Sequence, residues 1–299
     1  MEQYPTFQRD TRKPSRPPPP KSCDCQVHVF GDPAKFPLRS GGAYRPPADA
    51  TFATAQRMHR TLGLERGVVV QSTVHGTDHR TLFDALAGQP NYRGIALIDD
   101  SVSDKEIERL HEVGVRGARF NFWKMLNIVP SHAGFERAID RIKHLGWHAK
   151  IHATDAEWPE LADLLKKVKI PAVIDHLGHL DIRKGVDDPV FRLLLDFVKR
   201  ENWWMMVSNA DRISAMAQSW DDVVPYARKF IETAPDRIIW CTDWPHVRYD
   251  KPAMPNDAEL LELVYRFAPE PELQRKILAD NPARLFGFEL PAVRRYAAP

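Results

Sequence analysis

The chain contains little cysteine, with Cys23, Cys25 and Cys241 as its three thiols among 299 residues. An odd and sparse count argues against a disulfide framework and is typical of a reducing compartment, so we expect a cytoplasmic protein. No apolar run approaches the roughly 18 residues that a membrane-spanning helix needs, and the N-terminal residues lack the apolar segment of a secretory signal. We therefore expect neither a membrane partner nor export.

An excess of charge of one sign is also absent, because 42 Lys and Arg residues are balanced by 40 Asp and Glu residues, a net charge of +2. A dedicated nucleic-acid binder carries a clustered basic face, so we expect no nucleic-acid partner. Neither GxGxxG nor GxxxxGK(S/T) occurs, which argues against a doubly wound sheet with a phosphate loop. The oligomeric state stays open, and a monomer is compatible with the sequence.

Composition divides the chain into three parts. Residues 1–22 contain six of the 25 prolines and almost no aliphatic residues. The proline run 17–20 is incompatible with a helix or a central strand. We expect a disordered or extended proline-rich arm over 1–22, one barrel domain over 23–290 and a loose tail over 291–299.

Short strand-like segments alternate with helical patterns between these ends. The strand-like segments are 24–30, 66–72, 92–98, 115–122, 147–153, 171–176, 203–208 and 237–243. Helical patterns occur at 50–64, 136–146, 155–168, 187–201 and 221–234. Eight strand–helix units at a spacing of about 30 residues predict an α/β fold, the (β/α)8 TIM barrel, in a single domain.

Polar side chains lie at the carboxyl ends of the expected strands, where the active sites of such barrels lie. Asp24, Gln26 and His28 alternate along the first strand and are expected to face one way. The later strand ends supply Gln71, Ser72, Arg119, Asn121, His152, Asp175, His176, Thr242 and Asp243. We expect three histidines and one aspartate of this set to converge on a small volume, namely His28, His152, His176 and Asp243.

Several motifs around these residues resemble the amidohydrolase superfamily. They are QVHVF at 26–30, IDHLGH at 174–179, WCTDWPH at 240–246 and NPARLFGF at 281–288. A closer resemblance is to the group of 2-pyrone-4,6-dicarboxylate lactonases and 4-sulfomuconolactone hydrolases. It is carried by FGDPAKFPL at 30–38, YRPP at 44–47, RGARFNF at 116–122 and CTDWPH at 241–246. The resemblance implies a barrel enzyme that hydrolyses an anionic lactone in bacterial aromatic-compound catabolism.

Gln26 departs from the superfamily pattern, which has His-x-His after the first strand. Glutamine is a poor ligand for Zn²⁺, which prefers imidazole, thiolate or carboxylate. We therefore expect no obligatory cofactor. One weakly bound divalent metal such as zinc would be held by residues from the set His28, His152, His176 and Asp243.

Lactone hydrolysis needs an activated water, a polarised carbonyl and a stabilised oxyanion. Asp243 is expected to act as the general base and then as the general acid. His28 and His176 are expected to polarise the substrate carbonyl, as hydrogen-bond donors or through a metal. Since arginine matches carboxylate or sulfonate oxygens with two hydrogen bonds, we expect an anionic substrate. The candidate substrate-binding residues are Arg119, Arg212, Tyr44, Ser72, Lys124, His152 and Gln26.

The choice of lactone depends on Met125. Resemblance to the pyrone-dicarboxylate group implies a further arginine at or near this position, where the chain has methionine. Its absence favours 4-sulfomuconolactone or a close relative over 2-pyrone-4,6-dicarboxylate.

Two other functions stay open. A metal-dependent decarboxylase on the same barrel needs a firm metal site, which Gln26 disfavours. A catalytically inactive binding barrel is disfavoured by the presence of His28, His176 and Asp243. The remaining histidines beyond the strand ends are interpreted as surface residues, with the pocket rim as the alternative for the last two: His75, His79, His179 and His246.

Overall fold

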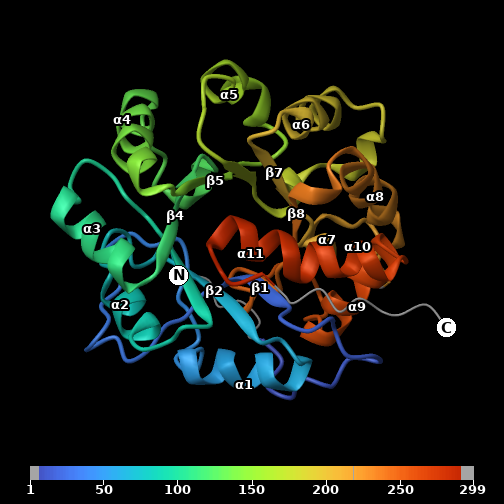
Figure 1. Cartoon of the computed structure of the whole chain (residues 1–299), viewed down its shortest axis with the longest axis horizontal. Coiled ribbons are helices and arrows are strands. Elements are labelled where there is room, and N and C mark those ends of the chain that lie inside the picture. Colours follow the sequence, from blue (N-terminus) through green and yellow to red (C-terminus); the bar gives the residue numbers. More distant parts are fainter. Residues whose placement is uncertain (1–6, 218, 291–299) are drawn as a thin grey trace.

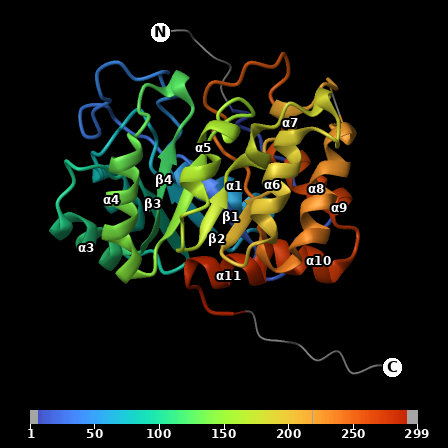
Figure 2. The same ribbon diagram turned by 90° about the horizontal axis from the view of Figure 1, so that it is seen from above.

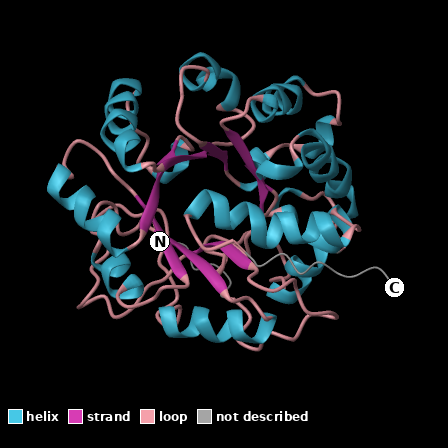
Figure 3. Cartoon of the chain, viewed as in Figure 1, coloured by secondary structure: helices cyan, strands magenta, loops and turns pink. Residues whose placement is uncertain are grey.

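The computed structural model describes residues 7–217 and 219–290, in which eight parallel strands form a barrel surrounded by helices (Figures 1 and 3). The strands are β1 Cys23–Val27, β2 Arg66–Val70, β3 Tyr92–Ala96, β4 Val115–Asn121, β5 His148–His152, β6 Ala172–Ile174, β7 Trp203–Met206 and β8 Ile238–Ile239. Each overlaps one expected segment, and neighbours in sequence are neighbours in the sheet. The predicted TIM barrel is confirmed.

Helices follow the strands and form the outer layer. They are α1 Phe52–Leu62, α2 Arg80–Leu86, α3 Asp104–Val113, α4 His132–Ile142, α5 Trp158–Leu165, α6 Pro189–Lys199, α7 Ala210–Ile213, α8 Val224–Thr233, α9 Asp257–Phe267, α10 Pro271–Arg275 and α11 Asn281–Phe286. Local sequence sets their ends. Thr51 caps α1 by accepting from the backbone N–H of Thr54, and Gly63 ends this helix in the left-handed conformation.

The barrel closes between β8 and β1. The backbone N–H of Cys25 donates to the carbonyl of Trp240 at 3.0 Å, and that of His28 donates to the carbonyl of Trp244 at 2.8 Å. Inside, buried side chains of the strands pack with the C-terminal segment: Cys23, Cys25, Val68, Val70, Ile95, Val173, Trp204, Met206, Ile239, Cys241, Ala283, Phe286 and Phe288. Helix α11 lies across this end of the barrel (Figure 2), which leaves the opposite end for a site.

An irregularity in β1 decides which way its polar residues face. Asp24 of β1 pairs with Gly67 of β2, and Val27 pairs with Val69. Between these two pairs β1 has two residues and β2 has one, so β1 carries one extra residue. Such a bulge breaks the alternation of side chains along a strand. Asp24 therefore accepts hydrogen bonds from the Thr242 hydroxyl and lies 3.2 Å from His59 of α1. The expectation that Asp24 faces the same way as Gln26 and His28 is wrong.

The described part of the proline-rich segment packs against the barrel domain. Residues 7–22 contain no regular helix or strand. The Phe7 ring packs edge-on against Trp244 at 4.8 Å, and Arg16 lies over the Tyr265 ring at 3.9 Å. The parts of the arm and tail at 1–6 and 291–299 lie outside the described residues. Among the helices that the structure describes, none combines the length and apolar composition needed to cross a membrane.

Candidate active site

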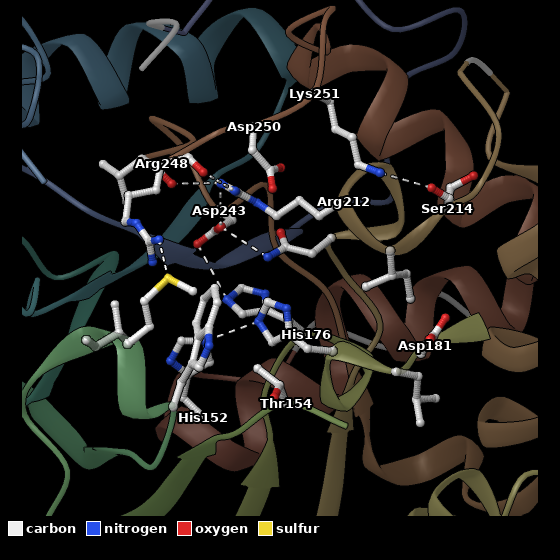
Figure 4. A pocket seen from close by; sticks show the side chains of 18 of the residues that line it. His152, Thr154, His176, Asp181, Arg212, Ser214, Asp243, Arg248, Asp250 and Lys251 are labelled. Atoms are coloured by element: carbon white, nitrogen blue, oxygen red, sulfur yellow. Dashed lines mark hydrogen bonds and ion pairs between the residues drawn. The ribbon is translucent and has the colours of Figure 1, made fainter. Parts of the chain in front are cut away.

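A pocket of about 930 Å³ opens at the carboxyl ends of the strands (Figure 4). Seven of the ten candidate catalytic and substrate-binding residues line it: His28, Tyr44, Arg119, His152, His176, Arg212 and Asp243. They come from segments far apart in the chain and meet because every parallel strand of a barrel ends at the same rim. The predicted convergence of His28, His152, His176 and Asp243 on one pocket is what the structure shows.

The Gln26 amide nitrogen lies at the centre of this group. Its Nε2 donates to Asp243 Oδ1 at 2.7 Å and lies 2.9 Å from His176 Nε2 and 3.4 Å from His28 Nε2. The carboxylate can only accept, which fixes the orientation of the amide. The two amide hydrogens serve Asp243 and His176, while Gln26 Oε1 has no hydrogen-bond partner among the described residues.

The hydrogen bonds of His28 define the tautomer of its neutral ring. Its Nδ1 lies 2.8 Å from the carbonyl oxygen of Val70, an atom that only accepts, so Nδ1 carries the hydrogen. Nε2 of the neutral ring is then an acceptor facing Asp243, whose Oδ1 is 3.5 Å away. In the neutral ring, Nε2 can therefore accept a hydrogen from water, whereas donation from Nε2 to a substrate carbonyl requires the protonated ring.

Asp243 is buried and surrounded by donors. Asn209 Nδ2 donates to its Oδ2 at 3.2 Å, and Arg212 Nη2 lies 3.6 Å from the same oxygen. Burial raises the pKa of the Asp243 carboxyl, but the neighbouring His176, His28 and Arg212 outweigh burial and hold that pKa well below its usual range. Asp243 is therefore a carboxylate at neutral pH.

A second buried carboxylate, Asp175, forms an ion pair with Arg119. Arg119 Nη2 lies 2.7 Å from Asp175 Oδ2, and Lys150 Nζ lies 3.2 Å from the other carboxylate oxygen. Burial raises the pKa of Asp175, but the charges of His176, Lys150 and Arg119 lower that pKa by more than burial raises it. The group therefore stays ionised. Arg119 thus lines the pocket as half of an ion pair rather than as an isolated cation at the rim.

Three candidate substrate-binding residues do not line the pocket. Lys124, whose side chain is 69% exposed, pairs with Glu160 and does not line the pocket. Ser72 is buried behind Tyr44, with 2.6 Å between their hydroxyl oxygens. Gln26 lies beneath the lining, fully buried. Of these three, none forms the pocket wall itself.

His179, Trp123, Asn209 and Arg248 line the pocket but were not identified from the sequence as binding residues. His179 Nε2 lies 3.1 Å from His152 Nε2, and its ring is tilted against that of Trp123. Its place in IDHLGH, directly after β6, was a signal for the pocket-rim alternative. The surface interpretation is wrong for the other three histidines, which are buried: His75, His79 and His246.

Acid should destabilise the protein through its buried histidines. Burial lowers the pKa of His179 to about 4 and that of His176 to about 3, against about 6.5 in an unfolded chain. Between pH 6.5 and 4 the unfolded chain binds protons that the folded protein does not, so the free energy of unfolding falls as the pH is lowered. Each unit of pKa difference is worth about 1.4 kcal/mol.

Urea unfolding at pH 7, 5.5 and 4 measures this fall. The His179→Asn variant should show a smaller decrease than the wild type over the same range. The exposed His132→Asn is the matched control and should follow the wild type. An equal decrease in the wild type and His179→Asn would contradict the assignment.

The fold and site define a class, the (β/α)8 hydrolases whose site lies at the carboxyl ends of the strands. A family profile described as Amidohydrolase matches residues 23–288, and the chain belongs to this family. It is 40% identical over 287 residues to a 2-pyrone-4,6-dicarboxylate hydrolase of Comamonas testosteroni, covering 91% of this chain and 93% of that protein. It is 38% identical over 278 residues to a 4-sulfomuconolactone hydrolase of Hydrogenophaga intermedia, covering 90% and 89%.

A solved structure shares the architecture. The Acinetobacter baumannii protein assigned as a 2-pyrone-4,6-dicarboxylic acid hydrolase, crystallised with citric acid bound, is 25% identical and superposes with a TM-score of 0.79. The match covers 90% of this chain and 100% of that one. The resemblance read from the motifs is thus confirmed at the level of family and fold.

The residues do not fit the metal that the superfamily pattern implies. The Gln26 amide nitrogen lies between His28, His176 and Asp243, and its hydrogens are directed at acceptors that a cation would need. Across residues 7–217 and 219–290, no group of three or more His, Cys, Asp or Glu side chains is arranged to hold an ion.

Substituting Gln26→His should raise the affinity for zinc by at least about tenfold, because imidazole is a preferred zinc ligand and the new ring would face His28, His176 and Asp243. Competition against a chromogenic chelator measures this affinity. Gln26→Asn, which keeps an amide, is the control and should bind zinc as weakly as the wild type. A stoichiometric, tightly held metal in the purified wild type would contradict the prediction.

Proposed function

We propose that the protein hydrolyses an anionic lactone, with Asp243 as the general base. The observation that carries the proposal is the position of Asp243, an ionised carboxylate 3.5 Å from His28 Nε2 and 3.6 Å from the Arg212 guanidinium at the floor of the pocket. The names of the Comamonas and Hydrogenophaga relatives support lactone hydrolysis as the reaction.

The gap between Asp243 and His28 suits the attacking water. Their 3.5 Å separation exceeds the usual length of a direct hydrogen bond, and both atoms accept hydrogen bonds when the His28 ring is neutral. A water above them would donate one hydrogen to each, with its lone pair directed into the pocket. As that oxygen attacks the lactone carbonyl, Asp243 takes the proton.

Arg212 is positioned to stabilise the carbonyl oxygen of the lactone. Its Nη atoms donate to the carbonyls of Val247 and Arg248, which fixes the guanidinium, and its buried Nε has no partner among the described residues. A fixed donor of positive charge stabilises the tetrahedral oxyanion. The ring C–O bond then breaks, and the leaving oxygen takes the proton from Asp243. The new carboxylic acid of the opened product loses the second water proton to solvent and becomes a carboxylate.

We propose 4-sulfomuconolactone or a close relative as the substrate, with 2-pyrone-4,6-dicarboxylate as the alternative. Both molecules carry acidic groups, which suits a pocket lined by Arg119, Arg212 and Arg248. The Acinetobacter relative was crystallised with citric acid, itself an acidic molecule, bound. Gln26, which is a poor zinc ligand, disfavours the decarboxylase.

A side-by-side assay of 4-sulfomuconolactone and 2-pyrone-4,6-dicarboxylate, followed by the loss of ultraviolet absorbance, tests the proposal. Activity on at least one of them, unchanged by dialysis against a chelator, is the expected result. γ-Butyrolactone, which is uncharged, is the control and should be a much poorer substrate. Hydrolysis of neither acidic lactone would overturn the proposed function and favour the inactive barrel.

A further inference from the structure

Arg248 lies on the loop that follows β8, at the wall of the pocket. Its backbone has φ +57°, a left-handed conformation that costs a residue other than glycine about 1 kcal/mol or more. Two hydrogen bonds hold this loop, because Arg212 donates to the carbonyl of Val247 at 3.0 Å and to that of Arg248 at 3.2 Å. The residue proposed to polarise the substrate thus also places Arg248.

The Arg248 side chain reaches across to the loop that follows β4. Its guanidinium lies 5.2 Å from the centroid of the Trp123 ring, and Nη2 is 2.6 Å from the Met125 sulfur. Figure 4 marks this contact by the dashed line that ends on the yellow sulfur atom, and it draws Arg212 and Arg248 on different sides of Asp243. The pocket therefore has guanidinium groups on two sides of the general base.

The surroundings of Arg248 suit an acidic group attached to a flat ring. The Trp123 ring contacts His152 edge-on at 5.7 Å and His179 at 5.6 Å, which fixes an aromatic wall of the pocket. A thioether is a weak hydrogen-bond acceptor. A carboxylate or sulfonate is a far stronger hydrogen-bond partner for a guanidinium than a thioether sulfur is.

We infer that Arg248 is a specificity-determining residue that binds a second acidic group of the lactone, while Arg212 acts at the reacting carbonyl. This inference rests on the proposed lactone hydrolysis. It defines the substrate class as a flat, unsaturated lactone with two acidic substituents, one of them against Trp123 and Met125. In place of the arginine that the resemblance implied at or near position 125, Arg248 on the loop that follows β8 supplies the positive charge.

Binding and turnover of three variants test the role of Arg248. Benzene-1,3-dicarboxylate is the non-hydrolysable probe, benzoate is the mono-acid control, and isothermal titration calorimetry gives Kd. Arg248→Met should raise Kd for the di-acid about tenfold or more, since a charged hydrogen bond is lost, and should change Kd for benzoate much less. Its KM for the better acidic lactone should rise by a similar factor with kcat little changed.

A relocated charge separates binding from a structural role. In the double variant Met125→Arg/Arg248→Met the guanidinium returns to the same place from the other loop, so the di-acid Kd should recover most of its loss. Arg192→Met removes an exposed arginine that pairs with Asp187 on the outer face and should match the wild type.

Wild-type Kd and KM in Arg248→Met would overturn the inference while the wild type still hydrolyses lactones. A loss of thermal stability with no change in di-acid binding would also overturn it, because Arg248 would then only link the two loops. Failure of the wild type to hydrolyse either lactone would count against the proposed function instead. The binding measurement with benzene-1,3-dicarboxylate still decides the role of Arg248 in that case.

Discussion

Replacing Asp243 by asparagine is expected to lower kcat about 10²- to 10⁴-fold, the usual contribution of general acid–base catalysis. The amide cannot take the proton of the attacking water. The fold should persist, because Asp243 has φ +63°, and asparagine tolerates this left-handed backbone well. Steady-state kinetics on the better acidic lactone measures the loss, and circular dichroism checks the fold.

Asp250→Asn is the matched control for this prediction. Asp250 also lines the pocket, but it is exposed at the mouth. Its variant should retain kcat within a few-fold of the wild type. Turnover near the wild-type level in Asp243→Asn would remove Asp243 from the mechanism and leave His28 as the acceptor of the water proton.

Arg119→Met is expected to destabilise the protein by about 3–5 kcal/mol, the usual cost of removing one partner of a buried ion pair. Arg119 is 5% exposed, and Asp175 is fully buried. The substitution leaves Asp175 with Lys150 as its cationic neighbour at 3.2 Å. The free energy of unfolding in urea measures the effect. An increase in KM alone, without loss of stability, would show instead that Arg119 acts chiefly on substrate.

A double variant isolates the ion pair in this second prediction. Arg119→Met combined with Asp175→Asn removes both charges, so it should be less destabilised than the sum of the two single variants. Arg137→Met is the control, because Arg137 forms a surface ion pair with Asp100, and exposed pairs contribute about 0–1 kcal/mol. Strict additivity of the two buried substitutions would contradict the pairing.

The architecture could be predicted from the sequence because its signals are local. Strand-like runs such as RGVVV at 66–70 form strands wherever they are covered on both faces, and helices such as α1 carry their own caps. Each of the eight expected segments contains a strand. The meeting of His28, His152, His176 and Asp243 follows from this, since a parallel barrel brings all strand ends to one rim.

The directions and partners of the polar side chains could not be predicted in this way. A single bulge in β1 turns Asp24 toward α1. Arg119 was expected to hold a substrate anion, and the structure adds an ion pair with Asp175, which directly follows β6. Neither effect is visible in the order of residues, because a one-residue change of register and a partner 56 residues away leave no local signal.

The sequence by itself determined the barrel, its rim and the residue types at the rim, because periodicity and strand order are properties of the chain. Tertiary structure decided what each of those side chains does. The Val70 carbonyl sets the tautomer of His28, and the packing of the β8 loop on Trp123 brings Arg248 into the pocket. Hydrogen bonds and charges act over a few ångströms in space, whatever the separation along the chain, so only the folded arrangement fixes them.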